Sequence, residues 1–357
     1  MSLTREPMRV FAKIYGIVLQ LLTYIRTGCA GDPTELILRQ ETDLQRETAA
    51  ALGAWPIVPQ SIHDPQPPQA LPRVLVVIPF RDRWDMTVVC LRALDKQKLG
   101  TLDVRVVLVD NGSVEPRTLS GIKGWISNPP KSFAVSNLRL DEDFNFSRLN
   151  NLAVDAFSAE FEPDFILFLN NDVELAGETF LSELLATAQK LPKAGAVGCT
   201  LNFPDGRIQH LFAAPGVKLV AAHPLKGRTL TPECAWFQRP RPVAATTGAL
   251  LLLRASIFKE VGGFDEHFPT LGQDIDLCLK LQKAGYANWV VPWLWATHHE
   301  GASRGEDLDR RQIAGMYMKW GDFLTENPYF SRSFSRWSEP PVLTLGWEPP
   351  FPWQLLV

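Results

Sequence analysis

The distribution of apolar residues predicts an open α/β sheet that begins near residue 73. Residues 73–80, RVLVVIPF, form a continuous apolar run, which is typical of a strand buried on both faces of a parallel sheet. A helical segment, MTVVCLRALDKQ, and a second buried strand, VRVVLVD, follow. A helix around residues 147–158 then leads to a third strand, FILFLNND. Alternation of strand and helix at this spacing indicates an α/β domain.

The pattern is different before residue 73. Residues 9–26 include an uncharged run of twelve residues, whereas a membrane-spanning helix needs about 20. Their helical period and basic edge predict an amphipathic helix that could lie on an anionic membrane. A helix docked on its own domain fits equally well, and a signal peptide is a third option, against which Arg26 and Gln20 count. Residues 56–72 are proline-rich and predict a linker.

We therefore expect three parts: a helical extension with its linker at 1–72, the α/β domain at 73–305, and a C-terminal helix and tail at 306–357. The tail is rich in proline and tryptophan, and eight of the eleven tryptophans lie at Trp236 or beyond. Tryptophan favours both membrane interfaces and the crevice between a tail and its domain. Both a tail at a membrane interface and a tail packed on its own domain are therefore consistent with the sequence.

The amino-acid composition excludes several classes of protein. The 357 residues are 46% hydrophobic and 21% charged, which excludes a disordered, collagen-like or polytopic membrane protein. A net charge of −3 gives no global basic field for nucleic acid. Five scattered cysteines without a CxxC pair indicate reduced thiols in the cytoplasm, several of them core residues. The missing GxGxxG and GxxxxGK[ST] motifs weaken an assignment as a dinucleotide-binding oxidoreductase or a P-loop protein.

Candidate chemistry lies where the predicted strands end, because ligands of open α/β sheets bind beyond the carboxyl ends of the strands. An Asp110-Asn111 pair can bind a nucleobase edge or ribose hydroxyls, and it is equally good turn sequence. In FLNNDVEL, Asp172 is a candidate ligand for Mg²⁺ or Mn²⁺, although a strand-terminating turn explains the segment as well. The third candidate is the segment Pro79-Phe80-Arg81.

Two later segments add candidates. In GQDIDLCLKL, Asp274 is a candidate general base at the start of a helix, and Asp276 is more plausibly structural. In ATHHEGASRG, adjacent histidines point in different directions, so at most one meets a metal held by Asp172. Arg304 in the same segment can pair with a phosphate.

Seven segments, in order, resemble those of family 2 glycosyltransferases: VLVVIPFRDRWD, VVLVDNGS, NFSRLNNLAV, FLNNDVEL, TTGALLLLRASIFKEVGGFDEHF, GQDIDLCLKLQKAGY and HHEGASRG. More narrowly, they resemble the bacterial, rhamnosyltransferase-like branch that builds O-antigen and other surface polysaccharides. The resemblance covers residues 73–305 and extends to NPYFSRSFSRWSEPPVLTLGW, which is similar to the family's ending. Each motif is weak alone, and their shared order is specific.

The resemblance implies a GT-A fold, a Rossmann-like open mixed sheet flanked by helices. It also implies a nucleotide-diphosphate sugar donor, a divalent metal (Mn²⁺ or Mg²⁺), a saccharide or lipid-linked acceptor, and inversion at the anomeric carbon. Asp274 matches the catalytic base. Asp172 and His298 match metal or diphosphate contacts, with His299 as the alternative register. The matched donor-binding positions are Pro79, Phe80, Arg81, Asp110, Asn111, Asn145, Asn151, Asn171, Gly248 and Arg304.

Two positions depart from the family pattern. The DxD element reads Asn170-Asn171-Asp172, and the Glu-Asp pair reads Gln273-Asp274, so each has lost its first carboxylate. These changes motivate an alternative reading as a non-catalytic sugar-nucleotide-binding protein. A nucleotidyltransferase should carry a glycine-rich loop after the first strand, and PFRDRWD has no glycine.

Because the family's acceptors are usually lipid-linked or membrane-proximal, we hypothesise a cytoplasmic enzyme that attaches reversibly to the inner leaflet. The alternative, in which both chain ends pack on the domain, remains open. No nucleic-acid partner is expected. The sequence does not indicate the donor sugar, the linkage or the oligomeric state.

Overall fold

The computed structural model describes residues 71–339, except 219, 230–237, 300–308, 326, 328 and 331–333. The predicted amphipathic helix, most of the predicted linker, Arg304 and most of the C-terminal tail lie outside the described residues. Among the described helices, none is both long enough and apolar enough to cross a membrane.

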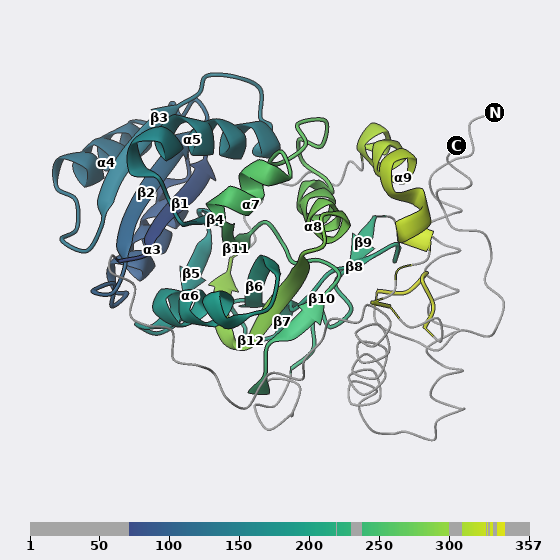
Figure 1. Cartoon of the computed structure of the whole chain (residues 1–357). Helices are drawn as coiled ribbons and strands as arrows, with labels where there is room; N and C mark the ends of the chain where they lie inside the picture. Colours follow the sequence, from purple (N-terminus) through teal and green to yellow (C-terminus); the bar gives the residue numbers. More distant parts are fainter. Residues whose placement is uncertain are drawn as a thin grey trace.

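Strands and helices alternate through the first half of the described chain (Figure 1). The elements are β1 (Arg73–Phe80), α3 (Trp84–Asp95), β2 (Asp103–Asp110), α4 (Pro116–Ser127), β3 (Ala134–Arg139), α5 (Phe146–Phe161), β4 (Phe165–Leu169), β5 (Val173–Leu175) and α6 (Phe180–Lys190). The second half contains more strands, several of them short. These elements are β6 (Ala194–Asn202), β7 (Ile208–His210), β8 (Ala214–Pro215), β9 (Ala221–Ala222), β10 (Arg241–Val243), β11 (Leu250–Arg254), α7 (Ala255–Glu260), α8 (Gln273–Lys283), β12 (Ala287–His298) and α9 (Arg310–Thr325).

Within the described residues, ten strands form one mixed sheet in the order β10-β12-β6-β11-β4-β1-β2-β3, with β5 on β12 and β7 on β6. Strands β3, β2, β1 and β4 are parallel. Strand β11 is antiparallel to both β4 and β6, so β6 points the same way as β4, and β12 is parallel to β6. The carboxyl ends of β1, β2, β4, β6 and β12 therefore lie on one edge of the sheet.

Apolar side chains fill both faces of the sheet. One core packs the sheet against α3, α4 and α6, with the fully buried Leu91, Leu181 and Leu184 among its members. The other core packs the sheet against α5, α7, α8 and α9. Continuous burial of β1 and β4 follows from helices on both sides. Cys90, Cys199 and Cys278 are free and buried, which confirms the prediction of core cysteines.

The predicted open mixed sheet flanked by helices is confirmed. The strands RVLVVIPF and VRVVLVD are confirmed almost to the residue. FILFLNND is shorter than predicted, because β4 ends at Leu169 and the polar residues that follow form a turn. It is also not the third strand, since β3 precedes it. Strand β3 is an edge strand with a half-exposed, polar sequence, AVSNLR, so it lacks the apolar run that marks its neighbours.

Candidate active site

The topology brings several predicted site residues to one edge of the sheet. Asp110 is the last residue of β2, Asp172 lies three residues beyond the end of β4, and His298 is the last residue of β12. The chain turns at Asn170 and pairs again through β5, whose Val173 is in register with His298. This pairing places segments that are 125 residues apart beside each other.

Asp172 and His298 lie side by side at this edge. Asp172 Oδ1 lies 3.1 Å from His298 Nε2, and only 11–12% of either side chain is exposed. His299 turns the other way, and its Nε2 lies 3.5 Å from Glu174 Oε2. The peptide N–H of His299 donates to the Asp172 carbonyl oxygen at 3.0 Å. The structure thus brings His298, and not His299, to the Asp172 carboxylate.

A cysteine lies beneath this pair. The Cys90 thiol approaches the Asn170 carbonyl oxygen at 3.7 Å. Burial, together with the carboxylates of Asp172 and Glu174, raises the pKa of the Cys90 thiol far above its ordinary value. Only a thiolate binds metal well, so Cys90 stays a neutral core residue.

Asp274 lies in the first turn of α8. Gly248 N–H donates to its Oδ2 at 3.0 Å, and Ile275 N–H donates to its Oδ1 at 2.9 Å. Gly272 adopts φ 79° just before the helix, a conformation that glycine allows without steric cost. The carboxylate is half-buried, so it is both oriented by backbone donors and open on one side.

A short hydrogen-bond path links Asp274 to the Asp172 turn. Gly248, which holds Asp274, is followed by Ala249, whose carbonyl oxygen accepts from Asn170 N–H at 2.9 Å. Asp172 lies two residues further along. The turn that carries Asp172 and the first turn of α8 that carries Asp274 therefore lie at the same edge.

Asp276 has a different environment. Its side chain is fully buried, accepts from Trp320 Nε1 at 2.8 Å and pairs with Lys319 Nζ at 2.6 Å and Lys280 Nζ at 3.4 Å. These contacts attach α8 to α9. The structure thus agrees with a structural Asp276, which acts as an interhelical anchor and not as a cap.

Asp110 and Asn111 are deeply buried. Both are 1% exposed. Asp110 Oδ1 accepts from Ser113 N–H at 2.8 Å, and its Oδ2 pairs with Arg139 Nη1 at 2.8 Å. Asn111 Nδ2 donates to the carbonyl oxygens of Leu140 and Glu142. Both side chains hold the loops after β2 and β3, and Arg139 is a partner that the sequence pattern did not indicate.

Asn145 and Asn151 clamp α5 to the loop before α8. Asn145 caps α5 by accepting from Arg148 N–H at 3.0 Å, and it donates to the Glu266 carbonyl oxygen at 2.9 Å. Asn151 both donates to and accepts from the backbone of Phe264. Asn171 Nδ2 instead donates to Thr87 Oγ1 on α3 at 2.9 Å.

The loop after β1 carries an exposed arginine, Arg81. The side chains of Pro79 and Phe80 are buried, whereas Arg81 is exposed and has no hydrogen-bond or ion-pair partner among the described residues. Asp82 and Arg83 follow with φ of 52° and 49°, in the left-handed region. Such backbone is costly for residues other than glycine. Asp82 Oδ1 compensates by accepting from Val114 and Glu115 N–H groups, which ties this loop to the start of α4.

Sequence reasoning missed Gln209, which approaches His298. Gln209 Oε1 lies 2.5 Å from His298 Nδ1, and Gln209 Nε2 donates to the His298 carbonyl oxygen at 3.4 Å. The residue lies on β7, in a stretch with no family motif that we recognised. No local sequence signal points to it, because the contact joins residues 89 positions apart.

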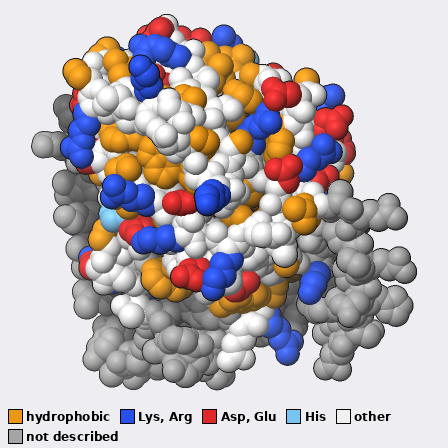
Figure 2. Space-filling model, turned by 90° about the vertical axis from the view of Figure 1, so that its left-hand side faces the viewer, with side chains coloured by type: hydrophobic (Ala, Val, Ile, Leu, Met, Phe, Trp, Pro, Cys, Tyr) orange, Lys and Arg blue, Asp and Glu red, His pale blue; other side chains and the backbone are white. Residues whose placement is uncertain are grey.

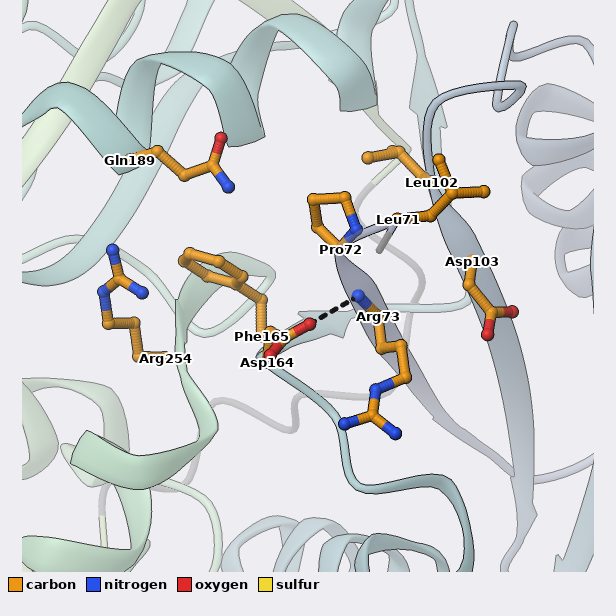
Figure 3. Close-up of a pocket in the computed structure, with 9 residues that line it drawn as sticks. All are labelled: Leu71, Pro72, Arg73, Leu102, Asp103, Asp164, Phe165, Gln189 and Arg254. Carbon is orange, nitrogen blue, oxygen red and sulfur yellow. Dashed lines mark hydrogen bonds between the residues drawn. The ribbon is translucent and has the colours of Figure 1, made fainter. Parts of the chain in front are cut away.

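A pocket of about 720 Å³ lies at the opposite edge of the sheet (Figure 3). Its lining includes Arg73 and Asp103 at the starts of β1 and β2, and Arg254 at the end of the antiparallel β11. Arg73 N–H donates to Asp164 Oδ2 at 2.8 Å, and the Arg254 guanidinium lies 4.8 Å from the Phe165 ring centroid. This is the amino-terminal edge of the parallel strands, where open sheets rarely bind ligands, so we assign the chemistry to the carboxyl edge.

Charge on the face that carries α4 and the β3 edge is mixed. Lys and Arg side chains alternate there with Asp and Glu (Figure 2). Examples are the exposed pairs Arg83–Asp85 and Arg139–Asp141. No single-sign field for a polyanion is visible on this face, in line with the composition.

Comparison with known proteins bears on this site. The sequence model described as glycosyl transferase family 2 matches residues 75–234. Protein y4gI of Sinorhizobium fredii is 38% identical over 74% of this chain and 29% of its own length. An N-acetylglucosaminyl-diphospho-decaprenol L-rhamnosyltransferase of Mycobacterium tuberculosis is 30% identical over 57% of this chain and 69% of its own length. The chain belongs to glycosyltransferase family 2.

The narrower resemblance to the rhamnosyltransferase-like members is also confirmed. The O-antigen biosynthesis protein RfbC of Myxococcus xanthus is 35% identical over 68% of this chain and 18% of its own length. The chain thus spans less than a third of the length of both y4gI and RfbC.

Solved structures confirm the GT-A fold. GalNAc-T7, crystallised with UDP, GalNAc and Mn²⁺, aligns with a TM-score of 0.57 and 16% identity over 73% of this chain and 50% of its own. The mannosyltransferase PcManGT of Pyrobaculum calidifontis, in complex with GDP-Man and Mn²⁺, aligns with a TM-score of 0.50 and 17% identity over 83% and 81%.

Proposed function

We propose that this family 2 protein is an inverting glycosyltransferase of surface polysaccharide synthesis. It moves a sugar from a nucleotide-diphosphate donor to a hydroxyl of a saccharide or lipid-linked acceptor. One observation carries the proposal: Asp274, oriented by Gly248 N–H at the start of α8, and the Asp172–His298 pair lie at the same carboxyl edge of the sheet. This arrangement supplies a base and a candidate cation-binding centre at one edge.

Asp274 acts as the general base. Two backbone N–H groups hold its carboxylate, and each oxygen keeps a further lone pair for an incoming hydroxyl proton. As the proton moves to Asp274, the acceptor oxygen attacks the anomeric carbon from the face opposite the diphosphate. The bond to the diphosphate oxygen breaks, and the leaving group takes its electron pair. One displacement inverts the anomeric carbon.

The residues at the other end of the site fit a divalent cation. Two ligand atoms bound side by side at about 2.1 Å from one ion lie about 3.0 Å apart. The 3.1 Å between Asp172 Oδ1 and His298 Nε2 meets this condition, and carboxylate and imidazole suit Mn²⁺. Among the described residues, no three His, Cys, Asp or Glu side chains cluster to enclose an ion. Asp172 and His298 would hold such an ion together with ligands from outside the protein, and the ion would supply positive charge next to the leaving diphosphate.

The donor nucleotide lies over the ends of β1 and β2. Arg81, exposed and unpaired, is the described cation best placed to approach it, with Arg304 as a further phosphate contact. Asp110, Asn111, Asn145, Asn151 and Asn171 shape the loops around it, and Asp110 reaches the base only after its contact with Arg139 opens. We keep these positions as proposed donor-binding residues.

The acceptor and the location follow from the relatives. The Mycobacterium tuberculosis relative is named for a decaprenol-linked substrate. A lipid-linked acceptor would bring this protein to the inner membrane surface. We therefore propose a cytoplasmic enzyme in peripheral contact with that membrane.

A second candidate function is sugar-nucleotide binding without transfer. Gln273 supports it, because this residue stands where the family carries an acid, is 6% exposed, and has a buried Oε1 without a hydrogen-bond partner. A charge at such a buried position would be costly, so an amide suits the local structure. The same observation is compatible with an active enzyme that uses only Asp274.

A donor screen separates the two. Nucleotide sugars are tested by thermal shift with and without Mn²⁺, since a ligand of the folded state raises the melting temperature. Release of nucleoside diphosphate from the best donor, together with a glycosylated acceptor of inverted configuration, supports the transferase. Binding without release over long incubation with acceptor extracts supports the binding protein.

A further inference from the structure

The pairing of β6 with β7 contains a β-bulge at Gln209. Leu201 pairs with His210, and Asn202 pairs with Ile208, so one step along β6 corresponds to two steps along β7. Gln209 is the extra residue between them. A bulge of this kind re-aims a side chain, and bulges are frequent beside active sites.

The re-aimed side chain contacts His298 at two points. It is 6% exposed, with Oε1 at 2.5 Å from the ring Nδ1 and Nε2 directed to the backbone carbonyl oxygen of His298. A carbonyl oxygen can only accept, so the NH₂ end of the amide must face it. The amide oxygen is then the atom beside Nδ1, and Nδ1 must carry a hydrogen.

This arrangement decides which ring nitrogen is free. In a neutral imidazole, a proton on Nδ1 leaves the lone pair on Nε2. Nε2 is the atom that faces Asp172 Oδ1 at 3.1 Å. Without Gln209, the ring could carry its proton on either nitrogen and could rotate.

We propose that Gln209 is a positioning residue that fixes the tautomer and orientation of His298, so that Nε2 faces a divalent cation shared with Asp172. The inference rests on the proposed function, since it needs a cation at Asp172. Outer-shell partners of this kind change metal affinity by about 10–100-fold.

The test uses Gln209→Met, which keeps the side-chain length and removes both polar contacts, and Gln209→Glu, which keeps an acceptor for Nδ1–H. Gln97→Met is the matched control. Gln97 is another buried glutamine that bridges backbone groups, at Ala93, Gly177 and Leu181, without a histidine partner. Melting temperatures of all variants report purely structural losses.

The first readout needs no metal. In full-length protein labelled with ¹⁵N-histidine, two-bond ¹H–¹⁵N correlation spectra report which nitrogen of His298 carries the proton. We expect a hydrogen on Nδ1 in wild type, Gln97→Met and Gln209→Glu, with or without a second one on Nε2, which faces Asp172. In Gln209→Met we expect Nδ1 to lose its hydrogen and the ring to shift to the Nε2–H form. An unchanged His298 tautomer in Gln209→Met overturns the proposal.

The second readout is the affinity for Mn²⁺ alone, by electron paramagnetic resonance. Gln209→Met should bind Mn²⁺ about 10–100-fold more weakly, while Gln97→Met and Gln209→Glu keep affinity within a few-fold of wild type. Equal losses in Gln97→Met and Gln209→Met overturn the positioning role. Wild type that binds no Mn²⁺ overturns the metal centre of the proposed function, whereas a tautomer shift would still support the action of Gln209 on the ring.

Discussion

The two halves of the candidate site use polar side chains in opposite ways. At the ends of β2 and β3, Asp110 and Asn111 are almost fully buried, and their contacts are to loop backbone and to Arg139. On the other side, Asp274 is half-buried, and the Asp172 side chain, 11% exposed, faces the imidazole of His298. The first half is built of residues that hold loops, and the second contains residues that can meet a substrate.

The comparison shows that a polar residue at a strand end is not automatically a ligand contact. Burial and ion pairing separate the two roles. Asp110 is 1% exposed and must lose its ion pair with Arg139 before it binds anything else, whereas Asp274 accepts only backbone hydrogen bonds and stays partly exposed. The same contrast occurs within one helix, between Asp274 and Asp276. Substitutions that remove charge and keep shape test this difference.

The largest effect is expected for Asp274→Asn. Loss of the base should lower the rate of transfer by about 10²–10⁴-fold, the usual contribution of general-base catalysis. Donor binding and the melting temperature should stay near wild type, since Asn still offers one acceptor to the backbone donors. Steady-state transfer assays and thermal shift measure both. Near-normal transfer would remove Asp274 from the mechanism.

Asp276→Asn should lower the stability of the protein and leave the rate of transfer nearly unchanged, which is the reverse of the result expected for Asp274→Asn. Removing one partner of a buried ion pair costs about 3–5 kcal/mol, and here the part-buried Lys280 would lose its counter-charge, while Lys319 would keep Asp265. Burial already lowers the pKa of Lys280. Denaturant unfolding should show the loss, while transfer measured well below the melting temperature stays within a few-fold. A large activity loss with unchanged stability would place Asp276 in the chemistry.

Asp172→Ala tests the metal end of the site. Because loss of an outer-shell partner already costs up to about 100-fold in metal affinity, loss of a ligand should exceed this. Calorimetry should show that Mn²⁺-dependent donor binding weakens while the free nucleoside still binds. Equal donor affinity with and without Mn²⁺ in wild type would contradict the assignment.

Asp110→Asn probes the loop-holding half. Its pair with Arg139, which is 39% exposed, is only partly shielded, so we expect a loss of about 1–2 kcal/mol in the free energy of unfolding. The loss should exceed that of Asp274→Asn in the same denaturant titration. A smaller loss would mean that Asp110 is available to the donor as it stands.

His210, next to Gln209, predicts a pH dependence of stability. Burial, followed by the nearby His223 and His298, lowers the pKa of His210 well below its ordinary value of 6.5. Below about pH 6.5 the unfolded chain therefore binds a proton that the folded protein does not. Stability should fall as the pH drops, by up to about 1.4 kcal/mol per pH unit for this group. His210→Gln should flatten the profile between pH 6.5 and 5; parallel profiles would contradict the assignment.

The fold class could be read from local pattern. The buried runs at β1, β2 and β4 and the helical periods between them depend on neighbouring residues alone, and the structure confirms them. The order of family motifs likewise indicated the family. Strand β3 was not predicted, because it is a half-exposed edge strand and carries no apolar run.

The site was only partly readable. The sequence placed Asp172 and Asp274 at the ends of elements, yet it did not distinguish open carboxylates from Asp110, whose partner Arg139 comes from another strand. It also assigned His298 to the metal only with His299 as the alternative register. The pairing of β5 with β12 determines which of the two histidines faces Asp172, because the register of the sheet sets the face on which each side chain lies.

Three properties follow from the amino-acid sequence alone: the alternation of strand and helix, the family, and the kinds of residue at each strand end. Tertiary structure decided the partners: which histidine meets Asp172, which aspartate is buried, and that Gln209 reaches His298 through a bulge. Local propensity acts over a few residues, whereas these contacts join residues up to 126 positions apart. They depend on sheet register and packing, and no short stretch of sequence encodes either one alone.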